Sequence, residues 1–365
     1  MDLGKRFERH LKRLVFGVLA GRARRDLIAP DAVDFQRCRR VLLVRVNYRL
    51  GNLLLVTPAI ESVRRAMPDA EIDFLGGDGG GDLLHAHPGL RRVLAASRDV
   101  LKSPQRFLAL VRELRGRRYD LVIDCARGAS FLGAALVGLS AGRYRVAQEG
   151  SRYQRFFNVL VPRAATSRHK VDLLLGFLGA LGLPIEGAGL RMPLGESEQR
   201  WAAERWAAFG LAADSRVVGV NLGGRGTKRW PRERFLEVAT RIERELGARV
   251  VVFVGPEEEG ELARIRTLLP PDAIVAPPVS VRRFAALLAR CRLVVTADTG
   301  PMHLAAAIGV PTITVFMAVS GRFYEPLGPL HTALRDPAAV SVDAVLEAVR
   351  RRLEASGAAE PSAVA

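Results

Sequence analysis

Short apolar runs alternate with amphipathic stretches along most of the chain. In its first half, apolar runs typical of buried strands cover residues 41–46, 71–75, 121–124 and 144–147. Stretches with the spacing of apolar residues that is typical of helices cover 57–67, 107–115, 131–139 and 170–181. Strands separated by helices of this length predict right-handed crossovers and a parallel sheet.

The same rhythm restarts after a glycine- and proline-rich junction at residues 182–189. Strands are predicted at 217–221, 249–254, 293–297 and 312–316, and helices at 196–209, from 231, at 300–308 and at 342–353. A helix, a short strand and a helix are predicted within 257–290. The sequence therefore predicts an α/β protein of two Rossmann-like, doubly wound domains facing a cleft. Ligands of such folds bind beyond the carboxyl ends of the strands, so the loops there should carry the chemistry.

The domain boundaries follow from this pattern. We expect a basic amphipathic segment at residues 1–36, an N-terminal domain at 37–186, a C-terminal domain at 187–340, and a C-terminal helix with a disordered tail at 341–365. Residues 1–40 hold eleven Lys and Arg against five Asp and Glu, a surplus of +6. A helix of this kind could lie on an anionic membrane surface, or it could pack on the protein's own core with a solvated basic face.

Composition narrows the class of protein. Hydrophobic residues make up 49% of the 365 residues, which excludes wholesale disorder. No run reaches the roughly 18 apolar residues of a membrane-spanning helix. The net charge of +17 favours anionic partners, but 6% aromatic residues and the lack of a recognised binding motif argue against nucleic acid. Three distant cysteines without a CxxC pair argue against a zinc cluster or a disulfide framework, and a reduced core Cys125 fits a cytosolic protein.

The loop after the first predicted strand, residues 47–52, is a candidate binding loop. Gly51 lets the backbone turn tightly, and the side chain of Asn52 would point into the cleft. An ordinary strand-to-helix turn would have the same sequence features, so this loop alone decides nothing.

A second candidate loop, residues 221–231, runs from a strand into a helix and contains Gly223, Gly224, Thr227 and Lys228. Backbone N–H groups, a helix N-terminus and an ammonium group together make a phosphate site. The spacing differs from that of a Walker loop, and no GxGxxG follows a strand, which argues against a dinucleotide-dependent oxidoreductase. A glycine-rich surface loop with an incidental lysine is the alternative.

A third candidate loop leads into the helix predicted at 300–308 and contains Asp298, Thr299, Gly300 and His303. A helix N-terminus aimed at the cleft suits a diphosphate leaving group. Alternatively, Asp298 or Thr299 only caps the helix, and His303 belongs to the core. The acidic residues 257–259 follow another strand, where they could bind a ribose diol or simply be solvated.

Three motifs together resemble glycosyltransferase family 9, the ADP-heptose:lipopolysaccharide heptosyltransferases. They are Arg-Leu-Gly-Asn at 49–52 followed by Pro58, Lys-Arg-Trp-Pro at 228–231, and Asp-Thr-Gly-Pro-Met-His-Leu-Ala at 298–305. The resemblance covers about residues 41–329. It implies a GT-B fold, a nucleotide-sugar donor, ADP-heptose, on the C-terminal domain, and a lipopolysaccharide-core-like acceptor on the N-terminal domain. It also implies inversion at the anomeric carbon without metal or cofactor, at the inner face of the cytoplasmic membrane.

The resemblance also implies roles for individual residues. Those placed on the donor are Asp298, Thr299, Gly300 and His303 at the diphosphate and sugar, Lys228 as counter-charge, Glu259 at the ribose, and Gly223 and Gly224 along the phosphate loop.

One position departs from the family pattern. That pattern has Gly-Asp in the first loop, with the aspartate as general base, whereas this chain has Gly51-Asn52. An amide does not accept a proton at neutral pH, so Asn52 can orient a hydroxyl but not deprotonate it. Either another carboxylate serves, with Asp78 in the glycine-rich segment 76–81 a candidate by location, or transfer is slow, or the donor is different. A catalytically inactive nucleotide-sugar-binding relative is the rival hypothesis.

Overall fold

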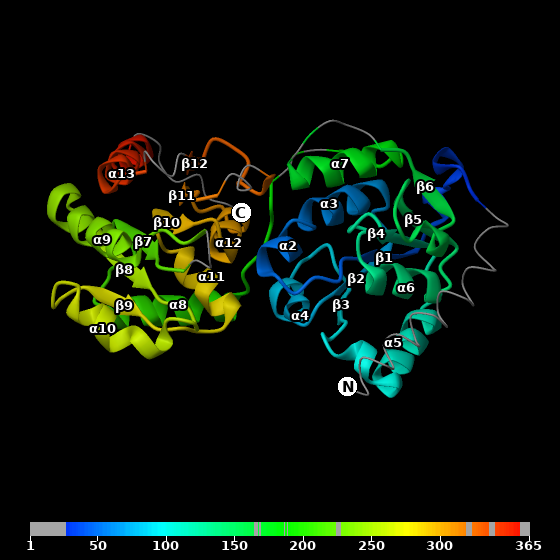
Figure 1. Ribbon diagram of the computed structural model, residues 1–365, viewed down its shortest axis with the longest axis horizontal. Helices are drawn as coiled ribbons and strands as arrows, with labels where there is room; N and C mark the ends of the chain where they lie inside the picture. The colour runs from blue at the N-terminus through cyan, green and yellow to red at the C-terminus, as the bar shows by residue number, and fades with distance from the viewer. Residues whose placement is uncertain are drawn as a thin grey trace. The chain divides into compact units, whose positions relative to one another are not determined.

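The computed structural model describes residues 27–163, 167, 169–185, 187, 189–223, 228–318, 323–335 and 340–357. The chain divides into two compact units, Met1–Ala188 (unit 1) and Gly189–Ala365 (unit 2). Each unit is built on a six-stranded sheet of its own (Figure 1). The predicted α/β fold of two Rossmann-like domains is confirmed. The amphipathic helix predicted near the N-terminus falls on residues 1–26, outside the described residues, as does the end of the tail from 358 on.

Unit 1 contains a parallel sheet in the order β3-β2-β1-β4-β5-β6. Its strands are β1 (Arg40–Val44), β2 (Glu71–Gly76), β3 (Arg92–Ala95), β4 (Leu121–Asp124), β5 (Tyr144–Gln148) and β6 (Val159–Val161). Its helices are α2 (Leu50–Leu54), α3 (Thr57–Ala66), α4 (Gly79–Leu84), α5 (Pro104–Gly116), α6 (Phe131–Leu139) and α7 (Lys170–Ala180). The strand order reverses between β1 and β4, which makes their carboxyl ends the topological switch point of this unit.

Unit 2 repeats this topology with the parallel order β12-β11-β10-β7-β8-β9. Its strands are β7 (Val217–Asn221), β8 (Arg249–Phe253), β9 (Ile274–Ala276), β10 (Leu293–Ala297), β11 (Thr312–Val315) and β12 (His331–Leu334). Its helices are α8 (Glu196–Ala208), α9 (Arg232–Leu246), α10 (Leu262–Thr267), α11 (Val281–Leu288), α12 (Gly300–Ala307) and α13 (Val342–Gly357). The switch point of unit 2 lies between β7 and β10.

The central strands are apolar because both faces of a parallel sheet are covered by helices. Val41–Val44 of β1 and all of β10 are buried. Helix α13 contributes to the same core as the sheet of unit 2, with four buried residues, Val345, Leu346, Val349 and Leu353. The C-terminal helix that we separated at residue 341 is therefore part of the hydrophobic core of unit 2.

Two segments that were predicted to be loops contain short helices. Asn52 lies inside α2, and the glycine-rich segment after β2 continues into α4. Glycine disfavours a helix by about 1 kcal/mol per residue. In α4 the side chains of Leu83 and Leu84 are buried, and burying a leucine contributes about 1.5–3 kcal/mol, which outweighs this cost.

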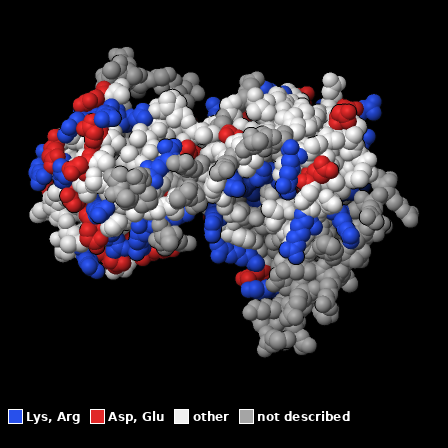
Figure 2. All heavy atoms as spheres, turned by 45° about the horizontal axis from the view of Figure 1, so that its top comes forward, with Lys and Arg blue, Asp and Glu red and all other residues white. Residues whose placement is uncertain are grey.

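Charge is distributed unequally between the two units. Unit 1 carries 32 Lys and Arg against 18 Asp and Glu, a net charge of +14, whereas unit 2 carries 23 against 20, a net charge of +3. On the face shown in Figure 2, basic and acidic side chains alternate over unit 2, while basic side chains predominate over unit 1. The anionic partners that the sequence favours are therefore attracted mainly to unit 1.

Candidate functional site

Polar side chains lie where β7 and β10 of unit 2 end. Asn221, the last residue of β7, is buried, and its Nδ2 donates a hydrogen bond to Oγ1 of Thr296 in β10 at 3.3 Å. A Cβ on Gly223 would lie 3.1 Å from the same Nδ2, so glycine lets the backbone pass close to this amide. The hydrogen-bonded side chains of Asn221 and Thr296 thus lie at the switch point of unit 2, next to the first residues of the predicted phosphate loop. Gly224 and Thr227 of that loop lie outside the described residues.

An ion pair joins the second and third candidate loops. Nζ of Lys228 lies 2.6 Å from Oδ2 of Asp298, whose side chain is only 4% exposed while that of Lys228 is 37% exposed. Nζ of Lys228 also lies 5.8 Å above the ring of Tyr324. A buried carboxylate needs a charged partner, so Asp298 holds the lysine ammonium at one place beside the strand ends. The two residues were predicted to act together on one ligand, and the structure brings them into contact.

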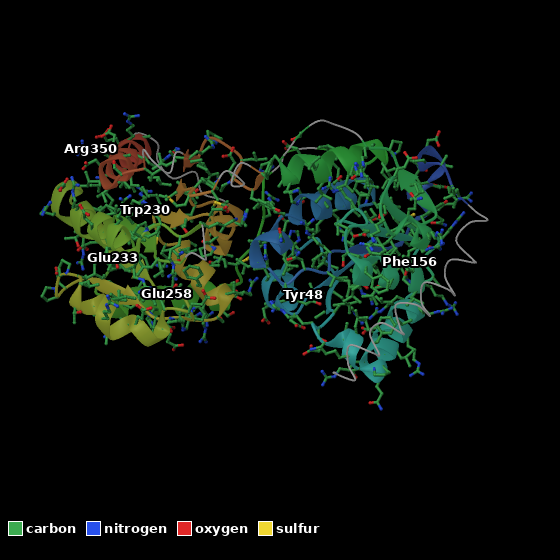
Figure 3. All side chains as sticks on the ribbon, in the orientation of Figure 1. Tyr48, Phe156, Trp230, Glu233, Glu258 and Arg350 are labelled. Atoms are coloured by element: carbon green, nitrogen blue, oxygen red, sulfur yellow. The ribbon has the colours of Figure 1, made fainter. Side chains whose placement is uncertain are left out.

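Trp230 anchors the backbone that carries Lys228. Its indole, labelled in Figure 3, is fully buried. Its ring meets that of Phe235 in α9 edge to face, with 4.7 Å between centroids. Pro231 is the N-cap residue of α9, and a proline there fixes the entry into the helix. The Lys-Arg-Trp-Pro motif is therefore a core anchor followed by a helix start, with the lysine left at the edge of the site.

The N-terminus of α12 directly follows Asp298. Thr299 is its N-cap residue and is extended, with φ −140° and ψ 177°, but its side chain does not cap the helix. Oγ1 of Thr299 instead donates to the carbonyl of Ala297 at 3.3 Å, and Gly300 and Pro301 form the first turn. This geometry therefore argues against the alternative in which Asp298 or Thr299 serves only as a cap of α12. The first turn keeps the partial positive charge of a helix N-terminus.

His303 lies one turn into α12 and is buried, with 6% of its surface exposed. This position fits a histidine that belongs to the core, and it equally fits a histidine that supports a ligand at the first turn of α12. Its predicted contact with the donor remains a prediction.

The acidic run after β8 separates into residues with different environments. Glu258 is buried, and its Oε1 lies 3.7 Å from Nη2 of Arg229 (Figure 3). Glu259, the residue that we predicted at the ribose, is exposed and starts a 3-10 turn, Glu259–Glu261. Sequence reasoning gave no basis for choosing among three consecutive glutamates. The structure ties Glu258 to Arg229, the residue next to Lys228.

In unit 1, Asn52 lies half-buried in α2, next to the buried Gly51. Nδ2 of Asn52 donates to Oδ1 of Asn47 at 3.2 Å, and the same oxygen accepts the N–H of Arg49 at 2.9 Å. The Asn52 amide is thus held by the loop that follows β1. This restraint suits an orienting residue, because the side chain has one preferred direction.

The loop that carries Asp78 packs on the loop that carries Asn47. A Cβ on Gly77 would lie 2.3 Å from the carbonyl oxygen of Asn47, so only glycine permits this approach. Oδ2 of Asp78 accepts the N–H of Arg98 at 3.1 Å, and the Asp78 side chain is exposed. Asp78 also contributes, after burial, to raising the pKa of Tyr48. Asp78, the candidate for the general base, is therefore a solvent-accessible carboxylate, and its loop contacts the loop that follows β1.

A carboxylate that sequence reasoning missed ends β4 beside β1. Asp124 is fully buried, and its two oxygens accept the N–H groups of Ala126 and Gly128, both at 2.8 Å. Burial raises its pKa to about 6, while these two donors, Arg45 and Arg127 act in the opposite direction. Because both oxygens are engaged by the backbone, Asp124 shapes the turn rather than taking a proton from a substrate.

Two other features are absent from the described residues. They contain no group of three His, Cys, Asp or Glu side chains arranged to hold a metal ion. In the same part of the chain, no helix is both long enough and apolar enough to cross a membrane. Cys38, Cys125 and Cys291 are buried free thiols.

Known proteins resemble this chain in sequence and in fold. Lipopolysaccharide heptosyltransferase 3 of Escherichia coli is 25% identical over 76% of this chain and 83% of its own length. Lipopolysaccharide heptosyltransferase 1 of Pseudomonas aeruginosa is 29% identical over 76% of this chain and 78% of its own. Both alignments span most of the two units.

Solved structures share the fold at lower identity. A family 9 glycosyltransferase from Veillonella parvula matches with a TM-score of 0.78 at 22% identity, covering 89% of this chain and 99% of that one. An Escherichia coli heptosyltransferase solved with ADP matches with a TM-score of 0.69 at 24% identity, covering 86% and 99%. The GT-B fold implied by the sequence motifs is confirmed.

The family model of glycosyltransferase family 9 (heptosyltransferase) matches residues 107–345. This stretch includes the switch point of unit 2 with its Lys228–Asp298 pair. It follows that the chain belongs to glycosyltransferase family 9, the heptosyltransferases, and is a glycosyltransferase.

Proposed function

We propose that this enzyme transfers heptose from ADP-heptose to a lipopolysaccharide-core-like acceptor, with inversion at the anomeric carbon. The observation that carries the proposal is the Lys228–Asp298 ion pair of 2.6 Å at the switch point of unit 2, directly before the N-terminus of α12. In doubly wound folds this is the place where a nucleotide binds. The relatives named lipopolysaccharide heptosyltransferases support the sugar and the acceptor class.

The chemistry follows from charge. When the bond to the anomeric carbon breaks, negative charge grows on the departing diphosphate, and fixed positive groups lower the barrier. Lys228, held by Asp298, and the first turn of α12 supply this charge, with Thr299 and Gly300 lining the turn. On this proposal neither a metal ion nor a cofactor takes part, and the nucleotide sugar is a co-substrate.

The acceptor hydroxyl must lose a proton during the transfer. Asn52, fixed by its hydrogen bond to Asn47, orients this hydroxyl. We assign the proton to a neighbouring carboxylate, for which Asp78 is the candidate, because its loop touches the loop of Asn47. If no carboxylate serves, the rival function of a nucleotide-sugar-binding protein without transfer activity follows.

We also place the enzyme at the inner face of the cytoplasmic membrane. The acceptor class is amphiphilic, unit 1 carries +14, and residues 1–40 are basic and amphipathic. Deleting residues 1–25 should release the protein from vesicles of anionic lipid and leave both units folded. Continued sedimentation of the truncated chain with vesicles at moderate salt would put the contact elsewhere, and loss of folding would make the segment part of the core.

The direct test of the proposed function is turnover of labelled ADP-heptose. The wild-type protein should release ADP and label the acceptor, whereas Lys228→Ala should do so far more slowly. Binding of ADP without any release from the sugar donor would instead support the inactive relative. Faster turnover with a different nucleotide sugar would correct the donor and leave the reaction class intact.

A further inference from the structure

The ammonium group of Lys228 lies where three segments of unit 2 meet. Lys228 belongs to the loop between β7 and α9, and Asp298, whose Oδ2 lies 2.6 Å from Nζ, follows β10. Tyr324 belongs to the segment between β11 and β12, and Nζ of Lys228 lies 5.8 Å from the centroid of its ring. Strands β7, β10 and β11 are consecutive neighbours in the sheet of unit 2 (Figure 1). The sheet thus brings an acidic side chain and an aromatic ring to the same lysine.

The contact between Lys228 and Tyr324 has the geometry of a cation–π interaction. An ammonium group within about 6 Å of a ring centroid is attracted by the negative face of the ring. The side chain of Lys228 is 37% exposed, and Tyr324 is partly buried, so both partners are partly withdrawn from water. Partial desolvation strengthens this kind of attraction. Tyr324 is therefore a second restraint on the ammonium, and none of the sequence motifs contains it.

The two partners of the ammonium act differently on an anionic ligand. Asp298 balances the charge of Lys228, but its carboxylate also repels a diphosphate that approaches the same place. The ring of Tyr324 attracts the ammonium and carries no net charge, so it holds Lys228 without repelling the ligand. A long lysine side chain loses rotamer freedom when it binds a ligand, and a side chain that is already held loses less. An aromatic partner therefore favours binding of an anion at this lysine.

The segment that carries Tyr324 is itself tied to the sheet. Nε of Arg335 donates to Oε2 of Glu325 at 2.8 Å, and Glu325 is the residue after Tyr324. Arg335 directly follows β12, which pairs with β11. The ion pair thus joins the residue next to Tyr324 to the end of the edge strand, which restricts where the ring can lie.

We propose that Tyr324 is a positioning residue of the donor site, whose ring holds the ammonium of Lys228 in place for the diphosphate of the nucleotide sugar. This inference rests on the proposed function, because that function places the diphosphate at Lys228. Tyr324 acts through Lys228, so its contribution should vanish when the lysine is absent. The face of the ring provides the attraction, so phenylalanine should replace tyrosine whereas leucine should not.

The first test observes the contact by NMR without any ligand. The chain has five lysines, so the resonances of isotope-labelled lysine side chains can be followed, and Lys228→Arg identifies that of Lys228. Protons above an aromatic ring are shifted upfield by its ring current. Tyr324→Leu should remove this shift from the ε-methylene protons of Lys228, and Tyr324→Phe should retain it. The resonance of Lys102, an exposed lysine of unit 1, should be the same in all variants.

The second test measures the affinity for inorganic diphosphate and for ADP by calorimetry. Tyr324→Leu should weaken both by roughly three- to tenfold, as for the loss of a partly desolvated cation–π interaction, and Tyr324→Phe should bind like the wild type. Trp201→Leu is the matched control, because it removes from α8 a ring whose centroid lies 4.9 Å from Cζ of Arg283. This control should leave both affinities unchanged.

A double-mutant cycle shows whether Tyr324 acts through Lys228. In the background of Lys228→Met, which has no ammonium, Tyr324→Leu should not weaken diphosphate or ADP binding any further. Equal weakening in both backgrounds would overturn the proposal, since the ring would then act on the ligand or on the fold of its segment. An unchanged Lys228 resonance in Tyr324→Leu would also overturn it.

Turnover of ADP-heptose on the same samples separates this inference from the proposed function. A wild-type protein that binds ADP but transfers no sugar, with the coupling between Tyr324 and Lys228 intact, would contradict the proposed transfer and support the role of Tyr324. Diphosphate affinity that Lys228→Met leaves unchanged would overturn the role of Tyr324, even if the wild-type protein transfers sugar.

Discussion

The two units have the same strand order but balance charge at their switch points in different ways. In unit 2, Lys228 is paired with the buried Asp298, and Arg229 lies 3.7 Å from the buried Glu258. In unit 1, the carboxylate at the equivalent place is Asp124, whose oxygens accept backbone N–H groups while Arg45 and Arg127 lie near it. One topology thus carries carboxylates paired with cations in unit 2 and a carboxylate bound by backbone N–H groups in unit 1.

This difference shows how a shared fold acquires two tasks. The strand order brings the ends of two strands together in each unit, but the loops decide what lies there. In unit 2, the paired carboxylate of Asp298 holds the ammonium of Lys228 in place and balances its charge. The net charge of +14 on unit 1 attracts anionic molecules. Substitutions at the two switch points test this difference in charge pairing.

The largest change is expected at the first loop of unit 1. Asn52→Asp places a carboxylate where the family pattern has its base, and general-base assistance contributes on the order of 10²–10⁴-fold. The amide of Asn47 would have to turn and donate to this carboxylate, since its Oδ1 now accepts from Asn52. If Asp78 does not already take the proton, the rate of ADP release with the same acceptor should rise, measured for both proteins under saturating donor.

Asp78→Asn is the control for this prediction. If Asp78 already serves as base, its loss lowers turnover by a similar factor and Asn52→Asp adds little to the wild type. Brisk wild-type turnover that neither substitution alters would contradict both assignments and leave Asn52 as an orienting residue only.

The next effect concerns the paired charges of unit 2. Lys228→Ala should weaken ADP binding by roughly 1–3 kcal/mol, as for a lost charge-assisted hydrogen bond. It should also lower kcat by on the order of 10²–10³-fold, since a group that stabilises growing charge is removed. Calorimetry with ADP measures the affinity, and a turnover assay measures kcat. Lys102→Ala, on the surface of unit 1, is the matched control, and unchanged ADP affinity in Lys228→Ala would remove Lys228 from the site.

A third effect concerns the pH dependence of stability through Asp124. Its pKa is raised from 3.8 to about 6 in the folded chain, so the folded state holds this proton more tightly than the unfolded state. The free energy of unfolding should therefore fall as pH rises from about 4 to 6, by at most about 3 kcal/mol from this group. Asp124→Asn does not titrate, so its stability relative to wild type should increase over this range. Chemical denaturation at pH 4.5 and pH 7 measures the difference, and a difference that is the same at both pH values would contradict the assignment.

Much of the fold could be predicted because its long elements have uniform patterns. Residues Val41–Val44 of β1 and all of β10 are buried, and continuous apolar runs mark them in the sequence. The strands β3, β6 and β12 were missed, because they have only three or four residues, and the side chains of β3 and β12 are also partly exposed. Pairing with a neighbouring strand, which the sequence does not show, defines such short elements.

The candidate site was predictable where a motif carries its own geometry. The Lys228 and Asp298 loops could be located because each follows an apolar strand and leads into a helix. Their ion pair could not be predicted, since the two residues are 70 positions apart. The same holds for Arg45 and Arg127, which only the sheet brings together. Long-range contacts of single side chains leave no local pattern.

The smallest expected effect separates two neighbouring glutamates in unit 2. Glu258 is buried beside Arg229, whereas Glu259 is exposed, although the resemblance placed Glu259 at the ribose. Glu258→Gln removes a buried charge and leaves Arg229 without this carboxylate, so ADP affinity should fall by about tenfold through misplacement of the Lys228 segment. Glu259→Gln keeps that pair, and it should weaken ADP about as much only if its side chain binds the ribose diol. Calorimetry with ADP and with inorganic diphosphate tells the two causes apart. A loss at Glu259 that appears with ADP and disappears with diphosphate would restore Glu259 to the ribose, whereas a loss at Glu258 with both ligands would show that paired charges position the diphosphate site of unit 2.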